Sequence, residues 1–291
     1  MKTAVKKKIF GVIGYPISHS LSPVMHNAVF KKFGIPAVYK AFEVKPETLK
    51  DFVRQMRNNR IAGVNVTIPH KETIIPFLKE VEDEPGLAGS IGAVNTVVIE
   101  KDRAVGYNTD GLGFIRAIKS LGFEFKGAKV ALLGAGGAAR AVSFNMATEG
   151  VSQIYIYDID TARAAQLVSI FKTRFPRTVK LAKNIPELNL EKCALLVNAT
   201  PVGMKDNRLA IDPQYLHKDL FIYDLVYNRQ ARHTTPLVEE ARKRGIRAHD
   251  GIWMLVFQGA ISSKLWFPQL DEKEVASVMF AGLRNEGFSA R

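Results

Sequence analysis

The chain has a single cysteine, Cys193, among its 291 residues. One thiol excludes an intrachain disulfide framework and a cysteine metal cluster, and we expect no metal site. The sequence also lacks any apolar run of the roughly 18–20 residues that a membrane span requires. The first apolar segment, residues 9–13, is too short for the core of a signal peptide. These absences favour a cytoplasmic protein with no membrane partner.

Acidic residues are scarce relative to basic ones. Lysine and arginine number 41 against 28 aspartates and glutamates, which gives a formal net charge of +13. Nucleic-acid-binding proteins often have such a balance, but here the basic residues are dispersed and no nucleic-acid-binding motif is present. We therefore expect no nucleic-acid partner and interpret the charge as a basic surface around a site for anionic small molecules.

Length and hydrophobic content indicate about two globular domains. Hydrophobic residues make up 47% of the sequence, which is enough for sizeable cores. In the first part predicted strands alternate with predicted helices: strands at 9–13, 37–43 and 62–68, helices at 23–33, 46–58 and 72–78, and a hairpin of 94–99 with 104–107. This alternation predicts an α/β domain with a mostly parallel sheet.

A glycine-rich turn begins the second part of the chain. The apolar run 130–133 ends at Gly134, and Gly134, Gly136 and Ala139 have the G-x-G-x-x-A spacing of a dinucleotide-binding turn. The first glycine would make the turn, and the second would let the backbone approach a pyrophosphate. The N–H groups at the start of the following helix would then face the phosphates. A helix that merely follows a glycine turn would show the same spacing.

The sequence after this turn supports the nucleotide interpretation. A second predicted strand, 153–157, ends in Asp158, 24 residues after Gly134, which is about where an acid would meet the ribose hydroxyls. Strands and helices continue to alternate after it. We predict a Rossmann-type, doubly wound NAD(P)-binding domain over residues 110–250. Residues 1–109, with C-terminal helices in 251–291, would form a substrate-binding catalytic domain.

Polar clusters are expected at strand ends, where α/β folds bind ligands. Ser18 and Ser20 follow the first strand and would bind a carboxylate or a polyol, or else cap the next helix. Lys71 follows the third strand as a solvated charge or as a proton-transfer group. Asp110 begins a helix, which it would cap by default. Together, a lysine, an aspartate and neutral polar groups would suit hydride transfer at a secondary alcohol.

The chain resembles the shikimate dehydrogenase family essentially from end to end. Seven segments carry the resemblance in order: residues 14–27, 63–71, 91–96, 106–111, 134–140, 198–201 and 250–259. The resemblance implies the reversible, NAD(P)-linked reduction of 3-dehydroshikimate to shikimate in chorismate and aromatic amino-acid biosynthesis. It also implies a monomer or a homodimer.

The same resemblance implies roles for single residues. Lys71 would transfer the proton, with Asp110 as its hydrogen-bonded partner. The other implied substrate ligands are Ser18, Ser20, Thr67, Asn95, Tyr227 and Gln258. The implied pyrophosphate ligands are Gly134, Ala135, Gly136, Gly137 and Ala138, with Leu225 and Gly251 at the nicotinamide end. Serine at both positions 18 and 20 is more similar to shikimate-specific members than to those that also use quinate.

The sequence departs from the family at the adenosine end of the cofactor. NADP-using members, the family default, usually carry Asn-Arg-Thr after the second Rossmann strand, and that arginine pairs with the 2′-phosphate. Here the segment reads Asp158-Ile159-Asp160, with Arg163 four residues after Ile159. An acid at position 158 would bind a free 2′-hydroxyl and repel a phosphate, whereas Arg163 could still reach a phosphate and Asp160 could cap a helix. We predict that NAD is used at least as well as NADP.

Two other functions stay open. An NAD-dependent quinate/shikimate dehydrogenase of quinate catabolism fits the acid at position 158, although Ser20 argues against it. A catalytically idle NAD(H)-binding sensor on the same fold would have no need of both Lys71 and Asp110.

Overall fold

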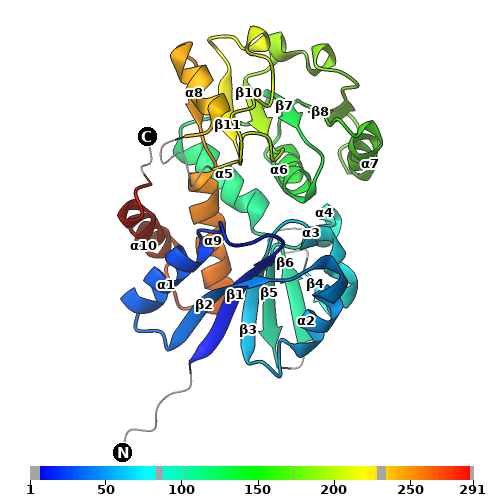
Figure 1. Ribbon diagram of the computed structural model, residues 1–291. Helices are drawn as coiled ribbons and strands as arrows, with labels where there is room; N and C mark the ends of the chain where they lie inside the picture. Colours follow the sequence, from blue (N-terminus) through cyan, green and yellow to red (C-terminus); the bar gives the residue numbers. More distant parts are fainter. Residues whose placement is uncertain (1–6, 83–87, 102, 173, 228–233, 289–291) are drawn as a thin grey trace, which may run out of the picture. The chain divides into compact units, whose positions relative to one another are not determined.

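The computed structural model describes residues 7–82, 88–101, 103–172, 174–227 and 234–288. Its contacts divide the chain into two compact units (Figure 1). The first is Met1–Gly113 with Val256–Ser289, and the second is Phe114–Leu255 with the last two residues. The divisions at 113/114 and 255/256 fall inside helices α5 (Asp110–Ser120) and α9 (Ile252–Trp266), where the sequence predicted 109/110 and 250/251.

The first unit is built on a six-stranded sheet in the order β2-β1-β3-β5-β6-β4. Its strands are β1 (Lys8–Gly14), β2 (Ala37–Glu43), β3 (Ile61–Val66), β4 (Glu80–Val81), β5 (Thr96–Glu100) and β6 (Arg103–Tyr107). β1 runs parallel to β2 and β3, whereas β5 runs antiparallel to β3 and β6. The hairpin makes the sheet mixed, because strands joined by a tight turn must run antiparallel.

Helices pack on this sheet through apolar side chains. They are α1 (Ser22–Lys32), α2 (Leu49–Gln55), α3 (His70–Thr73), α4 (Ala88–Ile91), α10 (Glu272–Asn285) and the 3-10 turns Pro46–Thr48 and Ile75–Phe77, with part of α5 and α9. Leu49 and Val53 of α2 join Ile13 and Val64 in one buried cluster. Helix α10 packs closely against α1 (Figure 1). Gly282 of α10 makes this approach possible, because a Cβ at position 282 would lie only 3.2 Å from the Ala28 Cβ.

The second unit has a parallel sheet in the order β12-β11-β10-β7-β8-β9. Its strands are β7 (Lys129–Leu133), β8 (Gln153–Tyr157), β9 (Val179–Leu181), β10 (Leu195–Asn198), β11 (Phe221–Asp224) and β12 (Ala248–His249). The chain leaves β7 through β8 to β9 and returns on the other side through β10, β11 and β12. This order confirms the predicted doubly wound Rossmann topology, whose ligand site lies where β7 and β10 diverge.

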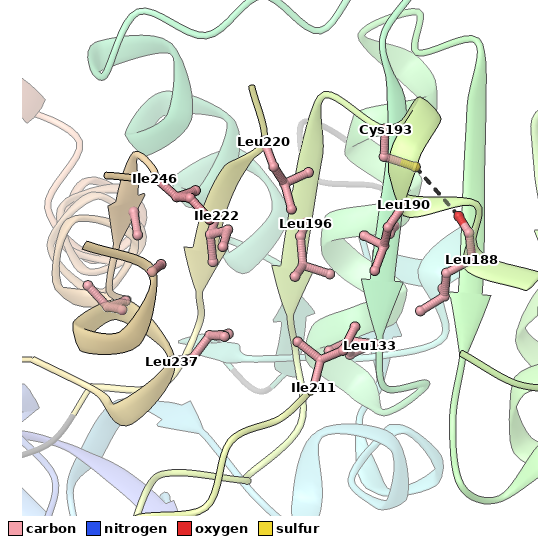
Figure 2. Packing of buried hydrophobic residues seen from close by; sticks show 14 of the residues in the cluster. Leu133, Leu188, Leu190, Cys193, Leu196, Ile211, Leu220, Ile222, Leu237 and Ile246 are labelled. Carbon is pink, nitrogen blue, oxygen red and sulfur yellow. Dashed lines mark hydrogen bonds between the residues drawn. The ribbon is translucent and has the colours of Figure 1, made fainter. Parts of the chain in front are cut away.

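The strands of this sheet are connected by α6 (Gly137–Thr148), α7 (Thr161–Phe171), α8 (Pro236–Lys243) and the 3-10 turns Pro186–Leu188, Leu190–Lys192 and Pro213–Tyr215. An apolar layer lies between the sheet, α8 and these turns (Figure 2). Leu133, Leu196 and Ile222 of adjacent strands share the layer with Leu237 of α8. Cys193 belongs to it too, and burial raises the pKa of its thiol to about 12. The cysteine therefore packs as an apolar group and is a poor nucleophile.

Candidate active site

Lys71 and Asp110 form an ion pair in the first unit. Lys71 Nζ donates a hydrogen bond to Asp110 Oδ2 at 2.6 Å, and only 15% and 7% of the two side chains are exposed. Lys71 lies on α3, the single turn after β3, and its carbonyl oxygen accepts the Val94 N–H at 2.7 Å. Asp110 is the first residue of α5. The fold therefore joins two of the three polar clusters that the sequence placed at strand ends.

Asn95 holds the other oxygen of the Asp110 carboxylate. Asn95 Nδ2 donates to Asp110 Oδ1 at 2.9 Å, and Asn95 Oδ1 accepts the Thr109 N–H at 2.7 Å. The Asp110 N–H donates to Asn108 Oδ1 at 3.0 Å. Both carboxylate oxygens are thus engaged by side chains, so Asp110 orients Lys71 in addition to beginning a helix.

A buried cluster of three hydroxyls, Thr96, Thr109 and Ser262, lies behind Asn95 and was missed by the sequence analysis. Each residue is at most 1% exposed. The Ser262 hydroxyl lies 2.8 Å from the Thr96 hydroxyl and 3.2 Å from that of Thr109, which accepts from Asn95 Nδ2 at 2.9 Å. Asn65 Nδ2 also donates to Ser262 Oγ at 3.0 Å. The one signal in the sequence is the serine pair 262–263 within the apolar helix α9.

Gln258, which the resemblance implied as a substrate ligand, contacts Asn95 beside the ion pair. Asn95 Nδ2 is 3.4 Å from Gln258 Oε1, and Gln258 is only 7% exposed. The residue is held in place by a close backbone contact, because a Cβ on Gly113 would lie 2.7 Å from the Gln258 nitrogen. Lys71, Asp110, Asn95 and Gln258 therefore form one connected group within the first unit.

Ser18, Ser20 and Thr67 lie on the loops that follow β1 and β3. These two loops adjoin, since a Cβ on Gly14 would lie 2.6 Å from Thr67 Cγ2. Ser18 is exposed and Thr67 is half-buried. Ser20 Oγ accepts the Ser22 N–H at 3.3 Å, but the N-cap residue of α1 is Leu21, so neither Ser20 nor Ser22 is the N-cap that the sequence left open.

The glycine turn in the second unit has the predicted local geometry. Gly134 has a φ of +100°, and a Cβ there would lie 2.9 Å from the Ala199 carbonyl oxygen, so both conformation and space require glycine. Gly136 is extended and precedes α6, whose first N–H groups lack partners within the helix. Ala139 is fully buried, as close packing of the helix on its strand requires. The turn is therefore suited to an anion such as a pyrophosphate.

Asp158 is anchored by two backbone N–H groups. Its Oδ2 accepts from Ala135 at 2.7 Å, and its Oδ1 accepts from Asp160 at 2.9 Å. Asp160 in turn caps α7 by accepting the Arg163 N–H at 3.1 Å. The Ile159 side chain is 91% exposed and carries no charge. Arg163 Nη2 lies 3.4 Å from the position of a Cβ on Gly136, so this guanidinium adjoins the turn.

The remaining cofactor and substrate candidates of the second unit lie after β11 and β12. The Gly251 N–H donates to the Val226 carbonyl oxygen at 3.1 Å, and a Cβ on Gly251 would clash with the Leu225 carbonyl oxygen. Leu225 and Gly251 are therefore neighbours. Tyr227 is half-buried and follows them in the same unit. Its contact with a substrate stays a prediction.

Two acids near this point, the buried Asp224 and the half-buried Asp250, were not predicted as site residues. Asp224 is 1% exposed, and burial raises its pKa to about 7 against the hydrogen bonds that it accepts. Burial also raises the pKa of Asp250 to about 6. The sequence could not single out these two acids, because an aspartate near the end of a predicted strand is also common in exposed turns.

Other kinds of site find little support in the described part of the chain. No three histidine, cysteine, aspartate or glutamate side chains gather there as a metal site would require. None of its helices is both long enough and apolar enough to cross a membrane.

Known proteins resemble this chain in sequence and in structure. Residues 12–97 match the family described as the shikimate dehydrogenase substrate binding domain. The shikimate dehydrogenase (NADP(+)) of Methanopyrus kandleri is 44% identical over 265 residues, which cover 89% of each chain. The crystal structure of the Aquifex aeolicus shikimate dehydrogenase matches with a TM-score of 0.86 at 37% identity, covering 97% of this chain and 99% of that one.

A further similar structure contains both a substrate and a nicotinamide cofactor. The Listeria monocytogenes shikimate 5-dehydrogenase, in complex with shikimate and NAD, matches with a TM-score of 0.82 at 32% identity and covers 96% of this chain and 99% of that one. The relative and the two structures cover 89–97% of this chain and so extend over both units. The chain therefore belongs to the shikimate dehydrogenase family.

Proposed function

We propose that this chain is a shikimate dehydrogenase, an oxidoreductase that reversibly reduces 3-dehydroshikimate to shikimate with a nicotinamide cofactor. The observation that carries the proposal is the Lys71–Asp110 pair, 2.6 Å apart and largely buried. Reduction of a ketone requires a proton donor beside a hydride source, and an oriented ammonium group is such a donor. The name of the Methanopyrus relative supports the same activity.

Lys71 moves the proton in this mechanism. During reduction its ammonium group gives a proton to the carbonyl oxygen while a hydride reaches the carbonyl carbon. During oxidation the amine takes the hydroxyl proton while the hydride leaves from the same carbon. Asp110 keeps Nζ directed through the 2.6 Å bond, and Asn95 keeps the carboxylate from turning by holding its second oxygen at 2.9 Å.

The glycine turn fits a dinucleotide, since Gly136 leaves open the space that a Cβ would fill beside Arg163. When bound, the nicotinamide cofactor supplies or accepts the hydride. We assign its pyrophosphate to residues 134–138 and its nicotinamide end to Leu225 and Gly251. The substrate's carboxylate and hydroxyls are assigned to Ser18, Ser20, Thr67, Asn95, Gln258 and Tyr227, which offer hydroxyl and amide groups.

We propose further that NAD is used at least as well as NADP. The Asp158 carboxylate lies against the glycine turn, and the neighbouring position, Ile159, offers no cation for a 2′-phosphate. Arg163 supports the opposite preference, because its guanidinium adjoins Gly136. The Methanopyrus relative is named for NADP, whereas the Listeria structure contains NAD. We weigh the repulsion between Asp158 and a phosphate above the attraction of Arg163.

The test is an assay that crosses shikimate and quinate with NAD and NADP. Shikimate oxidation with a kcat/KM for NAD at least equal to that for NADP would support both proposals. A tenfold preference for NADP, about 1.4 kcal/mol, would refute the cofactor assignment. Comparable turnover of quinate would favour a catabolic quinate/shikimate dehydrogenase. Binding of NAD(H) without turnover of either acid would favour a sensor.

Under this proposal the enzyme serves chorismate and aromatic amino-acid biosynthesis. We expect it to act in the cytoplasm as a monomer or a homodimer, on small-molecule ligands alone.

A further inference from the structure

The carboxylate of Asp224 joins the two ends of the segment between β11 and α8. Asp224 is the last residue of β11, and its Oδ2 accepts the hydroxyl proton of Thr235 at 2.6 Å. Thr235 is the N-cap of α8, fully buried, and its oxygen accepts the Val238 N–H at 3.4 Å. One buried contact therefore links the end of β11 to the start of α8, and Leu225–Tyr227 directly follow the carboxylate that makes it.

The second oxygen of Asp224 fixes how that segment begins. Asp224 Oδ1 accepts from Asn198 Nδ2 at 2.8 Å and from the Val226 N–H at 3.1 Å. The Leu225 N–H donates to the Asn198 carbonyl oxygen at 2.8 Å. The carboxylate thus ties together the ends of β10 and β11 and the start of α8.

The same backbone also contacts Gly251. Its N–H donates to the Val226 carbonyl oxygen at 3.1 Å, and any Cβ at this position would clash with the Leu225 carbonyl oxygen. Leu225 and Val226 are therefore fixed by hydrogen bonds to Asn198, Asp224 and Gly251. Tyr227 is the next residue, so these contacts set where its backbone begins.

Burying a carboxylate is costly, and an apolar group of similar size would fill the space at lower cost. The proposed mechanism gives Asp224 no contact with substrate, so its three hydrogen bonds need another reason. We propose that Asp224 and Thr235 form a clasp that positions Tyr227 for substrate binding. The inference rests on the proposed function, in which Tyr227 contacts shikimate, and it makes both clasp residues positioning residues.

The test combines Thr235→Val, which removes the hydroxyl at constant size, with Tyr227→Phe. Thr235→Val is expected to raise the KM for shikimate at least fivefold and to change kcat less than threefold, because loss of uniform binding acts on KM. Tyr227→Phe should act similarly, and the double variant should be no worse than the worse single variant. Thr235→Ser, which keeps the hydroxyl, should restore the KM to within twofold. Asp271→Ala, which removes the N-cap of α10, is the matched control and should leave the KM unchanged.

Amide hydrogen exchange supplies a readout that needs no turnover. In Thr235→Val the amides of Leu225–Tyr227 should exchange at least tenfold faster than in the wild type, and in Asp271→Ala they should not. Two results would overturn the clasp: amide exchange in Thr235→Val as slow as in the wild type, or a KM increase in the double variant equal to the product of the increases in the two single variants. Failure of the wild type to oxidise shikimate would instead refute the proposed function and leave the exchange result to decide the clasp.

Discussion

Asp158 accepts the backbone N–H of Ala135 at 2.7 Å, so the acid that follows β8 holds the glycine turn that follows β7. This contact places a negative charge beside the proposed pyrophosphate site. The exposed Ile159 next to it carries no compensating charge. The proposed adenosine end therefore combines the Asp158 carboxylate with the Arg163 guanidinium, whose Nη2 lies 3.4 Å from the position of a Cβ on Gly136.

Replacing Asp158 by Asn and Ile159 by Arg in one variant should shift the preference toward NADP. The change removes the repulsive charge and adds a guanidinium that can pair with a phosphate through two hydrogen bonds. We expect the ratio of kcat/KM for NADP to that for NAD to rise at least tenfold, about 1.4 kcal/mol, in steady-state assays. Asp158→Asn with Ile159→Gln is the matched control, and an equal shift in both variants would show that the arginine has no part in it.

Glycines 134 and 136 should respond differently to alanine. Gly134→Ala forces a side chain into a positive-φ position and against the Ala199 carbonyl oxygen, which should lower the free energy of unfolding by about 1–3 kcal/mol. In Gly136→Ala the backbone is extended and the new Cβ would lie 3.4 Å from Arg163 Nη2, an ordinary contact, so this variant should unfold like the wild type. It should nevertheless weaken NAD binding at least tenfold by titration, because its methyl group occupies the path of the pyrophosphate.

Local patterns predicted the parts of this fold that depend on local chemistry. The turn at Gly134 could be predicted because glycine readily adopts its positive φ, and the doubly wound class of the second sheet followed from the regular alternation of strands and helices. The hairpin of β5 and β6 was readable from two β-rich runs around Lys101, which adopts a φ of +49°. The short strands β4 and β12 were not predicted, because two residues are too few to establish a period.

Long-range polar contacts could not be derived from local patterns. Ser262 joins Thr96 across 166 positions, and no spacing rule connects them. Asp224 and Thr235 both stand at ends of elements, where aspartate and threonine are common for local reasons. For Lys71 and Asp110, the residues alone allowed a surface charge and a helix cap, and the resemblance supplied their pairing, which the structure contains at 2.6 Å.

Thr109→Val should loosen the support of Asp110. The variant keeps the size of the buried side chain but removes the hydroxyl that accepts from Asn95 Nδ2 and contacts Ser262. We expect the free energy of unfolding to fall by about 1–3 kcal/mol, as for a buried polar group left without its partner. Urea denaturation measures it. Thr148→Val, at an exposed site whose hydroxyl donates to the Phe144 carbonyl oxygen of the same helix, should cost about 0.5 kcal/mol or less.

Asp224 should make stability fall as pH rises. Burial raises its pKa from 3.8 to about 7, so the folded state binds the proton more tightly than the unfolded state does. Its contribution to stability is therefore lost between about pH 4 and pH 7, by at most about 4 kcal/mol at 1.4 kcal/mol per pKa unit. Asp224→Asn removes this dependence. The unfolding free energy of Asp224→Asn minus that of the wild type should therefore rise steadily from pH 4 to pH 7. Two parallel curves of unfolding free energy against pH would contradict the raised pKa of Asp224.

The central claim is that Lys71 transfers the proton in a shikimate dehydrogenase, and the most direct measurement is shikimate oxidation by the wild type and by Lys71→Ala with NAD and with NADP. The wild type is expected to turn over shikimate with both cofactors. In the variant kcat should fall at least about a hundredfold, as for loss of a general acid–base, while shikimate binding is largely kept. A variant that turns over shikimate as fast as the wild type, or a wild type that turns over none, would contradict the account.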